Sequence, residues 1–280
     1  MKANEIRIRR VQQVKKDINS LNKPIIALLH LDAFPGDPYY KRGTTMKQIV
    51  AQAGKDLEAL QKGGVDAILF SNEFGIPYRN IADHLTTAAM GRIIGELMGD
   101  ISVPYGVDLL QDPINIIDLA VAVDASFVRE QFTGAFVGEG GVFRTDIAET
   151  LRRKRQLGAD DLRMFYFLNN ESDAYLNDRD YGTIVKSMVF KCHPDGICVA
   201  GIHAGNDPRT DWISEVKQAA GSTKVFCNTG CKKENICEKL TAADGAFVGT
   251  TFKVDGKFEN FIDYKRVKEF MDVVREFRGE

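Results

Sequence analysis

The sequence predicts an α/β fold in which a single (β/α)8 barrel, a TIM barrel, is built from residues 25–280. Short apolar runs alternate with segments of helical periodicity, which is the pattern of repeated βα units. The runs are almost continuously apolar, as is typical of parallel strands that are buried on both faces. The length of 280 residues and the hydrophobic content of 44% are sufficient for one such barrel.

Eight apolar runs supply the number of strands that this barrel requires. They recur at a spacing of roughly thirty residues, which leaves room for a helix between successive runs. The predicted strands are Ile25–His30, Ala67–Ser71, Pro104–Asp108, Ser126–Arg129, Arg163–Leu168, Gly196–Val199, Lys224–Cys227 and Gly245–Val248.

The segments between these runs are predicted to be helices. Met46–Lys62 has an apolar face, and Gly63 and Gly64 end it. Asp112 is a suitable N-cap, because Pro113 then occupies the first helical position. The other predicted helices are Ala82–Met98, Asp146–Gln156, Asp180–Lys191, Thr210–Ala220, Lys233–Leu240 and Tyr264–Phe277.

A doubly wound open sheet is the competing architecture. It usually has fewer strands, and a Gly-rich loop often follows its first strand. The segment from His30 to Tyr40 contains no G-x-G-x-x-G pattern. No change of composition and no Pro- or Ser-rich linker divides the chain, so we expect one domain over residues 1–280.

Residues 1–24 are expected to form a helical extension in front of the barrel. They contain seven Lys/Arg and two acidic residues, and Val11, Val14, Ile18 and Leu21 recur at helical spacing. The segment lacks the apolar core of a secretory signal. This amphipathic helix either closes one end of the domain or contacts an anionic membrane.

Charge and cysteine content exclude several classes of protein. A formal charge of -2 excludes a globally basic nucleic-acid binder, so we expect no nucleic-acid partner. No apolar run approaches the length of a membrane span. The five cysteines form no C-x-x-C motif, which favours core thiols over a disulfide scaffold or a zinc site. We therefore expect a cytoplasmic protein.

Polar or ionisable residues follow almost every predicted strand. The active site of a TIM barrel lies at the carboxyl ends of its strands, so these residues are expected to share one face. Part of the enrichment has a structural origin, because Asp and Asn also cap the helices that follow. A protein that served only as a scaffold would not require polar residues at almost every strand end.

The last two strand ends predict a phosphate site. Backbone N–H groups in Gly-containing turns at helix N-termini bind anions, and the loops after strands seven and eight form the usual phosphate site of TIM barrels. Two ordinary turns that need glycine for their geometry are the alternative. Lys253 either adds a positive charge or is solvated. The predicted phosphate-binding residues are Asn228, Thr229, Gly230, Gly249, Thr250, Thr251 and Lys253.

Four segments resemble the BtpA family, which includes a photosystem I biogenesis protein and the SgcQ-like proteins. The resemblance covers nearly the whole chain from Lys23 onward and implies a ribulose-phosphate-binding type of TIM barrel. This implication agrees with the phosphate site predicted from the strand ends. The four segments are His30–Pro38, Ser71–Tyr78, Gly106–Asp112 and Ala243–Lys253.

The chain also departs from the pattern of the BtpA family. The family's fifth strand often ends in a V-H-V-K-H-A-like segment, whereas Phe167–Ala174 contains neither lysine nor histidine. A Schiff-base role of that lysine therefore does not carry over. The segment after the sixth strand gains a histidine, His203. A different substrate or chemistry thus stays open.

Five residues at the strand ends are candidates for catalysis. His30 and His203 are each either a general acid/base or a histidine with a backbone partner. Glu73 and Asp108 follow adjacent strands, so their carboxylates are expected to converge and to bind Mg²⁺ or polarise a sugar hydroxyl. Arg129 neutralises one of these carboxylates or binds a substrate anion.

Two further features of this face have open roles. Asn72 and Asn206 suit hydroxyl recognition, and they equally suit turns. The Gly-rich segment 133–141 follows the fourth strand and forms either a lid over the ligand or a flexible connection.

The leading hypothesis is an enzyme that acts on a phosphorylated sugar or a similar metabolite by proton transfer, as isomerases, epimerases and lyases do. The first alternative is a non-enzymatic assembly or regulatory factor, as the photosystem member of the family suggests. The second is a hydrolase or phosphorylase that requires a divalent metal such as Mg²⁺. Homo-oligomerisation stays open, because no segment specifies an interface.

Overall fold

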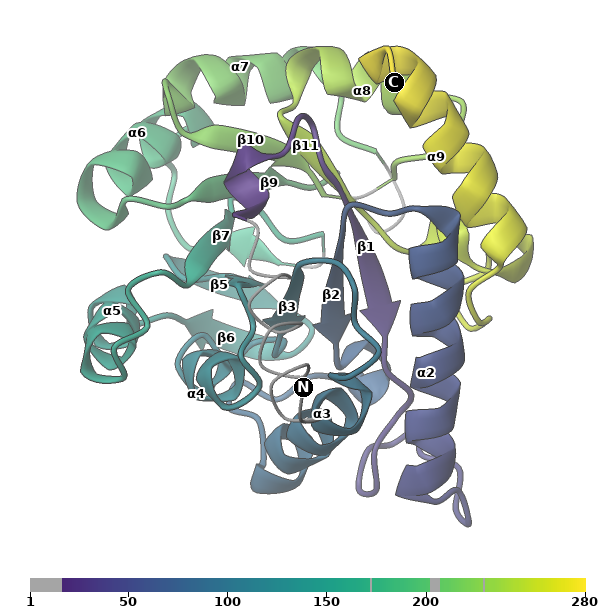
Figure 1. The fold of residues 1–280 in the computed structure, drawn as a ribbon. Coiled ribbons are helices and arrows are strands. Elements are labelled where there is room, and N and C mark those ends of the chain that lie inside the picture. Colours follow the sequence, from purple (N-terminus) through teal and green to yellow (C-terminus); the bar gives the residue numbers. More distant parts are fainter. Residues whose placement is uncertain (1–16, 172, 202–206, 229) are drawn as a thin grey trace.

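The computed structural model describes residues 17–171, 173–201, 207–228 and 230–280. Eight parallel strands close into a barrel with helices around its outside, which confirms the predicted TIM barrel (Figure 1). Around the barrel, the strands follow the order β1-β11-β10-β9-β7-β4-β3-β2. Their bounds are β1 Ile25–His30, β2 Ala67–Ser71, β3 Tyr105–Asp108, β4 Phe127–Glu130, β7 Arg163–Phe167, β9 Gly196–Val199, β10 Lys224–Cys227 and β11 Gly245–Val248.

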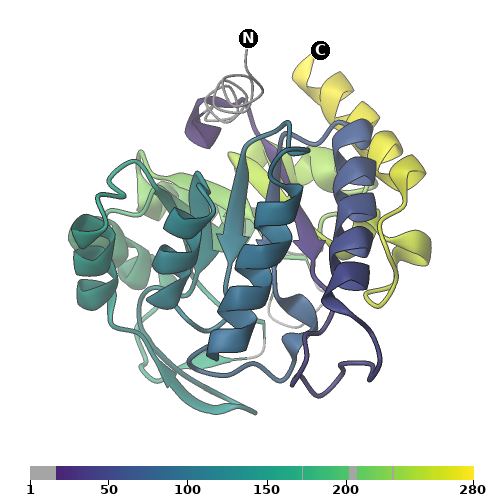
Figure 2. The same ribbon diagram turned by 60° about the horizontal axis from the view of Figure 1, so that its bottom comes forward.

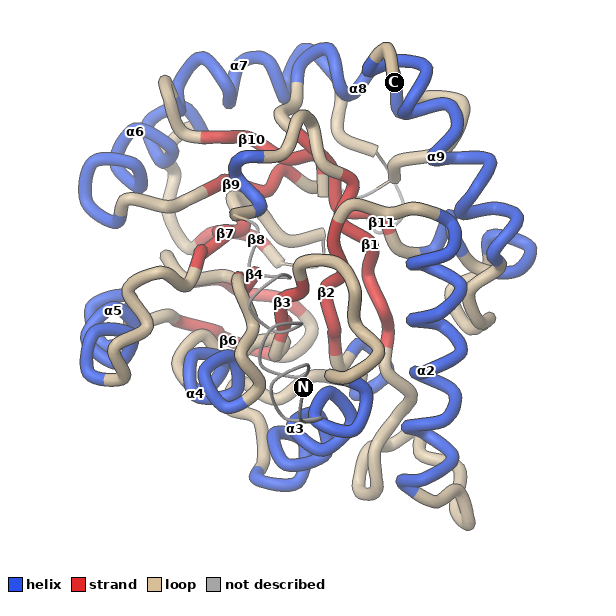
Figure 3. Tube along the Cα trace, viewed as in Figure 1, coloured by secondary structure: helices blue, strands red, loops and turns tan. Residues whose placement is uncertain are grey.

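The helices form a ring around the barrel strands, as the blue and red tubes of Figure 3 show. Several predicted starts are wrong: the helix after β2 begins at His84, not at Ala82, and the helix after β3 begins at Asn115, not at Pro113. The helix after β10 begins at Ile236, not at Lys233. The Asn235 side chain accepts the Lys232 N–H at 2.7 Å, so this stretch forms a turn before the helix. The helices are α2 Met46–Gly63, α3 His84–Leu97, α4 Asn115–Ala122, α5 Ile147–Gln156, α6 Tyr181–Cys192, α7 Thr210–Ala220, α8 Ile236–Ala242 and α9 Tyr264–Arg278.

Alternation along the strands explains why the site is polar. Successive side chains of a strand point to opposite faces, so every second residue points into the barrel. Leu28 and Phe127 belong to the apolar cluster inside the barrel. Two residues further along the same strands come His30 and Arg129, both buried. The interior thus changes from apolar to polar at the carboxyl ends of the strands.

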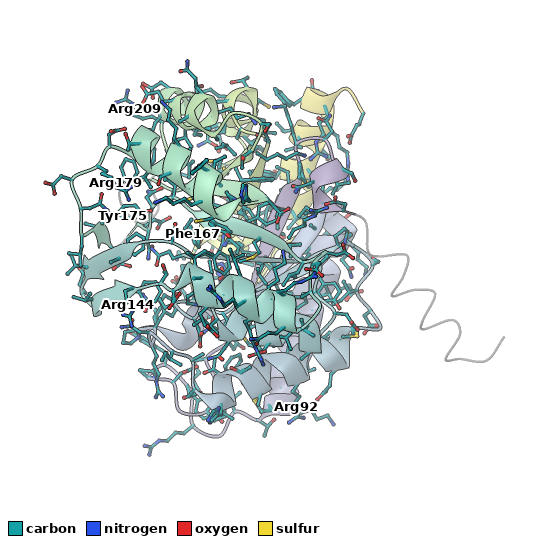
Figure 4. The ribbon with its side chains drawn as sticks, turned by 90° about the vertical axis from the view of Figure 1, so that its left-hand side faces the viewer. Arg92, Arg144, Phe167, Tyr175, Arg179 and Arg209 are labelled. Carbon is teal, nitrogen blue, oxygen red and sulfur yellow. The ribbon has the colours of Figure 1, made fainter. Side chains whose placement is uncertain are left out.

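A short antiparallel sheet replaces the irregular loop expected over residues 133–141. Strands β5 (Ala135–Gly138), β6 (Gly141–Arg144) and β8 (Ala174–Tyr175) pair in the order β6-β5-β8. The rings of Phe136 and Tyr175 pack with their centroids 4.4 Å apart. In Figure 4, Arg144 and Tyr175 of this sheet lie to the left of Phe167, which is the last residue of β7. Regular pairing, rather than a flexible connection, therefore holds this segment at the carboxyl end of the barrel.

The amino end of the barrel is closed by a short 3-10 helix, η1 (Ile18–Ser20). Ile18 is buried against the cluster inside the barrel, and Leu21 packs on the same cluster. Figure 2 shows η1 and the end of α9 at one end of the barrel and the β5–β6 hairpin at the other. Residues 1–16, most of the predicted amphipathic helix, lie outside the described residues. In the described part of the chain, no helix is long and apolar enough to cross a membrane.

Candidate active site

A cavity of about 920 Å³ opens at the carboxyl ends of the barrel strands. Every strand of the barrel contributes its last residues or the loop that follows it. Pockets of this size and position hold small-molecule ligands in TIM barrels. The residues that line the cavity include His30, Glu73, Arg129, Glu130, Gln131, Asn228, Gly230, Lys232, Lys233, Gly249, Thr250, Thr251 and Arg266.

Arg129 occupies the inner end of the cavity. Its Nε and Nη2 donate to Oδ2 of Asp108 at 3.0 and 2.5 Å, and its Nη1 donates to Oδ1 of Asn228 at 2.7 Å. The guanidinium carbon lies 4.8 Å from the ring centroid of Phe167 and 5.1 Å from that of Phe247. Of the two carboxylates expected near Arg129, Asp108 is therefore its partner, and Asn228 belongs to this polar group.

Glu73 and Asp108 have different partners. Glu73 accepts the hydroxyl hydrogen of Ser71 at 2.9 Å and lines the cavity, whereas Asp108 is engaged by Arg129. Among the described residues, no group of three or more His, Cys, Asp or Glu side chains is arranged to hold a metal ion. The guanidinium of Arg129 neutralises the charge of Asp108, and binding of Mg²⁺ by Glu73 and Asp108 stays a prediction.

His30 is a neutral imidazole at the wall of the cavity. It is 8% exposed, and neither ring nitrogen has a hydrogen-bond partner among the described residues. The pKa of His30 is lowered to about 4, chiefly by burial; the negative charge of Glu73 opposes this shift, and the positive charges of Lys253 and Arg129 add to it. A Cβ atom at Gly249 would lie 3.0 Å from Nε2 of His30, so a larger residue there would require the imidazole ring to shift.

A hydrogen bond joins the two predicted phosphate loops. Thr251 donates its hydroxyl hydrogen to the carbonyl oxygen of Cys231 at 2.6 Å. Arg266 of α9 donates its Nε–H to the carbonyl oxygen of Thr251 at 2.9 Å. The 3-10 helix η3 (Thr250–Phe252) starts directly after Gly249, and the first N–H groups of a helix have no partner inside it. These N–H groups lie on a rim that also carries cationic side chains.

Sequence reasoning missed several residues that line the cavity. Lys232 and Lys233 follow the loop after β10 directly, a signal that was visible in the sequence. Arg266 belongs to a helix after the last strand, where no motif marks it. Gln131 is 1% exposed, and its side-chain oxygen and nitrogen both lack a hydrogen-bond partner among the described residues.

Two predicted binding residues point elsewhere. The Lys253 amine donates to the carbonyl oxygen of Phe258 at 2.5 Å and lies 4.7 Å from the ring centroid of Phe74. Lys253 is therefore held behind the cavity wall and is not among the lining residues, which corrects its assignment as a phosphate ligand. Asn72 accepts the N–H of Leu110 at 2.9 Å, so its side chain links the loops after β2 and β3 rather than closing a turn of its own. The predicted site residues His203, Asn206 and Thr229 lie outside the described residues.

Comparison with known proteins identifies the family. The model of the BtpA family matches residues 21–276. The chain belongs to the BtpA family. It is 44% identical to the putative sgc region protein SgcQ of Escherichia coli K12, over 94% of this chain and 98% of that protein. It is 27% identical to the photosystem I biogenesis protein BtpA of a Synechocystis species, over 91% of this chain and 89% of that protein.

The fold of this BtpA family member is shared with solved TIM-barrel enzymes. One is (S)-3-O-geranylgeranylglyceryl phosphate synthase from Thermoplasma acidophilum, solved in complex with sn-glycerol-1-phosphate. Its TM-score is 0.57 at 15% identity, and the alignment covers 99% of each chain. At this identity the similarity shows the fold alone.

Proposed function

We propose that this BtpA family protein is an enzyme that binds a phosphorylated sugar or a similar metabolite and catalyses proton transfer on it. The observation that carries the proposal is the division of the cavity into two unlike ends. Its rim joins two Gly-containing loops and cationic side chains, and its inner end holds buried polar groups. A ligand with a phosphate at one end and hydroxyl or carbonyl oxygens at the other matches this division.

The rim is the proposed phosphate site. The N–H groups of Thr250 and Thr251 begin η3, and Lys232, Lys233 and Arg266 line the same side of the cavity. Backbone N–H groups and cationic side chains together bind phosphate oxygens. The positive charge at this rim therefore comes from Lys232, Lys233 and Arg266 rather than from Lys253.

The inner end is proposed to hold the hydroxyl or carbonyl end of the ligand. Gln131 offers a side-chain amide that has no hydrogen-bond partner among the described residues, and His30 offers a neutral imidazole. Buried polar groups are rarely left without a hydrogen bond, so these side chains are expected to bind ligand oxygens. Isomerases, epimerases and lyases need such groups to move protons between carbon and oxygen.

Thermal unfolding with sugar monophosphates tests this proposal. A ligand that binds only the native state raises stability by about 2.7 kcal/mol at a concentration of 100 times its Kd. We expect ribulose phosphate or a related monophosphate to raise the Tm, with and without Mg²⁺, and Gly249→Asp to abolish the shift. The control is Gly140→Asp, because a side chain at Gly140 meets open space. If no phosphate compound shifts the Tm, the assembly-factor alternative is favoured.

A further inference from the structure

Glu130 lies beside the Asp108–Arg129 pair and lines the cavity. The carboxyl groups of Glu130 and Asp108 interact electrostatically, and Oδ1 of Asp108 has no hydrogen-bond partner among the described residues. One oxygen of Glu130 accepts the N–H of Gln111 at 3.0 Å, and the other accepts the N–H of Gln131 at 2.7 Å. Glu130 is only 2% exposed, so two carboxyl groups and one guanidinium are buried together.

The charges of this group require a proton. Two ionised carboxylates beside one guanidinium would leave a net negative charge away from water, which is costly. Burial raises the pKa of Glu130 well above its usual value, and the negative charge of Asp108 raises it further. Arg129 binds Asp108 through two N–H groups, so the charge stays on Asp108 and the proton on Glu130.

The backbone is shaped to hold Glu130 in this position. Gln111 has a φ of 62°, in the left-handed region that residues other than glycine rarely adopt. That conformation directs its N–H to Glu130 Oε2. Unfavourable backbone conformations of this kind concentrate at functional sites. The position of Glu130 is therefore fixed by strand β4 and by the N–H groups of Gln111 and Gln131.

We propose that Glu130 is a catalytic residue, which donates its proton to an oxygen of the bound ligand while Asp108 acts as a positioning residue. This inference rests on the proposed function and deepens it. A ligand suited to this group has a carbonyl group next to a carbon that bears hydrogen, as aldose and ketose phosphates do.

The proposed step balances as an enolisation. The carbon beside the carbonyl loses a proton to the neutral imidazole of His30, and its C–H electron pair becomes part of a C=C bond. The carbonyl oxygen takes the proton of Glu130, which gives an enediol, a carboxylate and an imidazolium. The reverse transfers return both protons and leave the protein unchanged.

Exchange in D2O tests the step without a known product. Dihydroxyacetone phosphate and ribulose phosphate are incubated with the full chain, and proton NMR follows the hydrogens beside the carbonyl. The wild type is expected to replace them with deuterium, and Glu130→Gln to do so at least about a hundredfold more slowly. Glu130→Asp, which keeps an acid, is expected to recover part of the rate. The control is Glu96→Gln, at an exposed pair with Arg92 on α3.

Carbon-13 NMR of the Glu and Asp carboxyl carbons provides a second readout. In the wild type, we expect the signal of one carboxyl carbon to show that its group is still protonated at neutral pH. This signal should be absent from Glu130→Gln. In Asp108→Asn, the Glu130 carboxyl is expected to titrate at lower pH, because it then becomes the carboxylate partner of Arg129. Asp108 and Arg129 are the charged groups that act on it most strongly.

The outcomes separate this inference from the proposed function. A folded Glu130→Gln variant that still binds the monophosphates but has lost exchange supports the inference. Wild-type exchange rates in Glu130→Gln, no exchange by a wild type that binds the monophosphates, or an ionised Glu130 at neutral pH would overturn it and leave phosphate binding intact. Absence of binding by the wild type would overturn the proposed function itself.

Discussion

Thr251 donates its hydroxyl hydrogen to the carbonyl oxygen of Cys231 at 2.6 Å, across the space between the loops after β10 and β11. The two loops belong to different βα units, and each supplies lining residues on the cationic rim. This hydrogen bond therefore sets the relative position of the two halves of the proposed phosphate site.

Replacement of Thr251 by Val removes this hydrogen bond with little change of shape. We expect a loss of stability of about 1 kcal/mol and a weaker thermal shift by ribulose phosphate. The control is Thr241→Val, because Thr241 also donates to a backbone carbonyl at 2.6 Å but is exposed. An unchanged ligand shift in Thr251→Val would show that the loops hold their positions without this bond.

Removal of the Arg266 side chain tests the cationic rim. Arg266 is exposed, so we expect Arg266→Ala to weaken the binding of a sugar monophosphate by at most about 1 kcal/mol, or about fivefold. Added salt is expected to reduce the difference from wild type. Titration calorimetry measures both effects, with Arg92→Ala on α3 as the control. Equal affinities of wild type and Arg266→Ala at low salt would remove this residue from the site.

His30 is expected to make stability depend on pH. Its pKa is lowered from 6.5 to about 4 by burial, so between these values the unfolded chain binds more protons than the folded one. Stability contributed by neutral His30 is therefore present above 6.5 and is lost as the pH falls toward 4. The upper limit is about 3 kcal/mol.

Denaturant unfolding at several pH values checks this effect. The difference in unfolding free energy between wild type and His30→Gln should change across the window from 4 to 6.5, in the direction of a relative loss for the wild type at low pH. The comparison cancels other groups, such as Asp56, whose pKa is raised to about 6 by burial. His84→Gln, at an exposed position, is the control. A constant difference would mean that the pKa of His30 is the same in the folded and the unfolded chain.

The buried pair of Arg129 and Asp108 is expected to show strong coupling. Arg129→Met leaves the Asp108 carboxylate buried without its cation, which costs about 3–5 kcal/mol. Asp108→Asn combined with Arg129→Met removes both charges and should recover part of that loss. Chemical denaturation of the two single variants and the double variant measures the coupling. Additive effects would contradict a direct ion pair.

The barrel follows from the sequence because each strand is a short run that is buried on both faces. Runs such as Gly196–Val199 and Lys224–Cys227 coincide with β9 and β10, since little else accommodates continuous apolar residues of that length. The β5–β6 hairpin escaped prediction. Its strands are short and rich in glycine, and its partner β8 lies some thirty residues further along the chain.

Side-chain direction limits what the sequence predicts about the site. Lys253 follows the motif that suggests a phosphate ligand, yet its amine is bound by the carbonyl of Phe258. Glu130 adjoins Arg129 in the sequence, and its importance arises from its burial together with Asp108 and Arg129, which the one-dimensional pattern does not contain. Spacing therefore identifies the strand ends that carry the site, whereas packing decides which side chains face the ligand.

The most direct test of phosphate binding in this cavity is a crystal structure of the protein with ribulose phosphate, or with inorganic phosphate if the sugar is turned over. We expect phosphate oxygens within hydrogen-bond distance of the Thr250 and Thr251 N–H groups, next to Lys232 or Arg266, with the sugar directed toward Glu130. A phosphate bound outside this cavity, or an empty cavity at millimolar ligand in a folded protein, would contradict it.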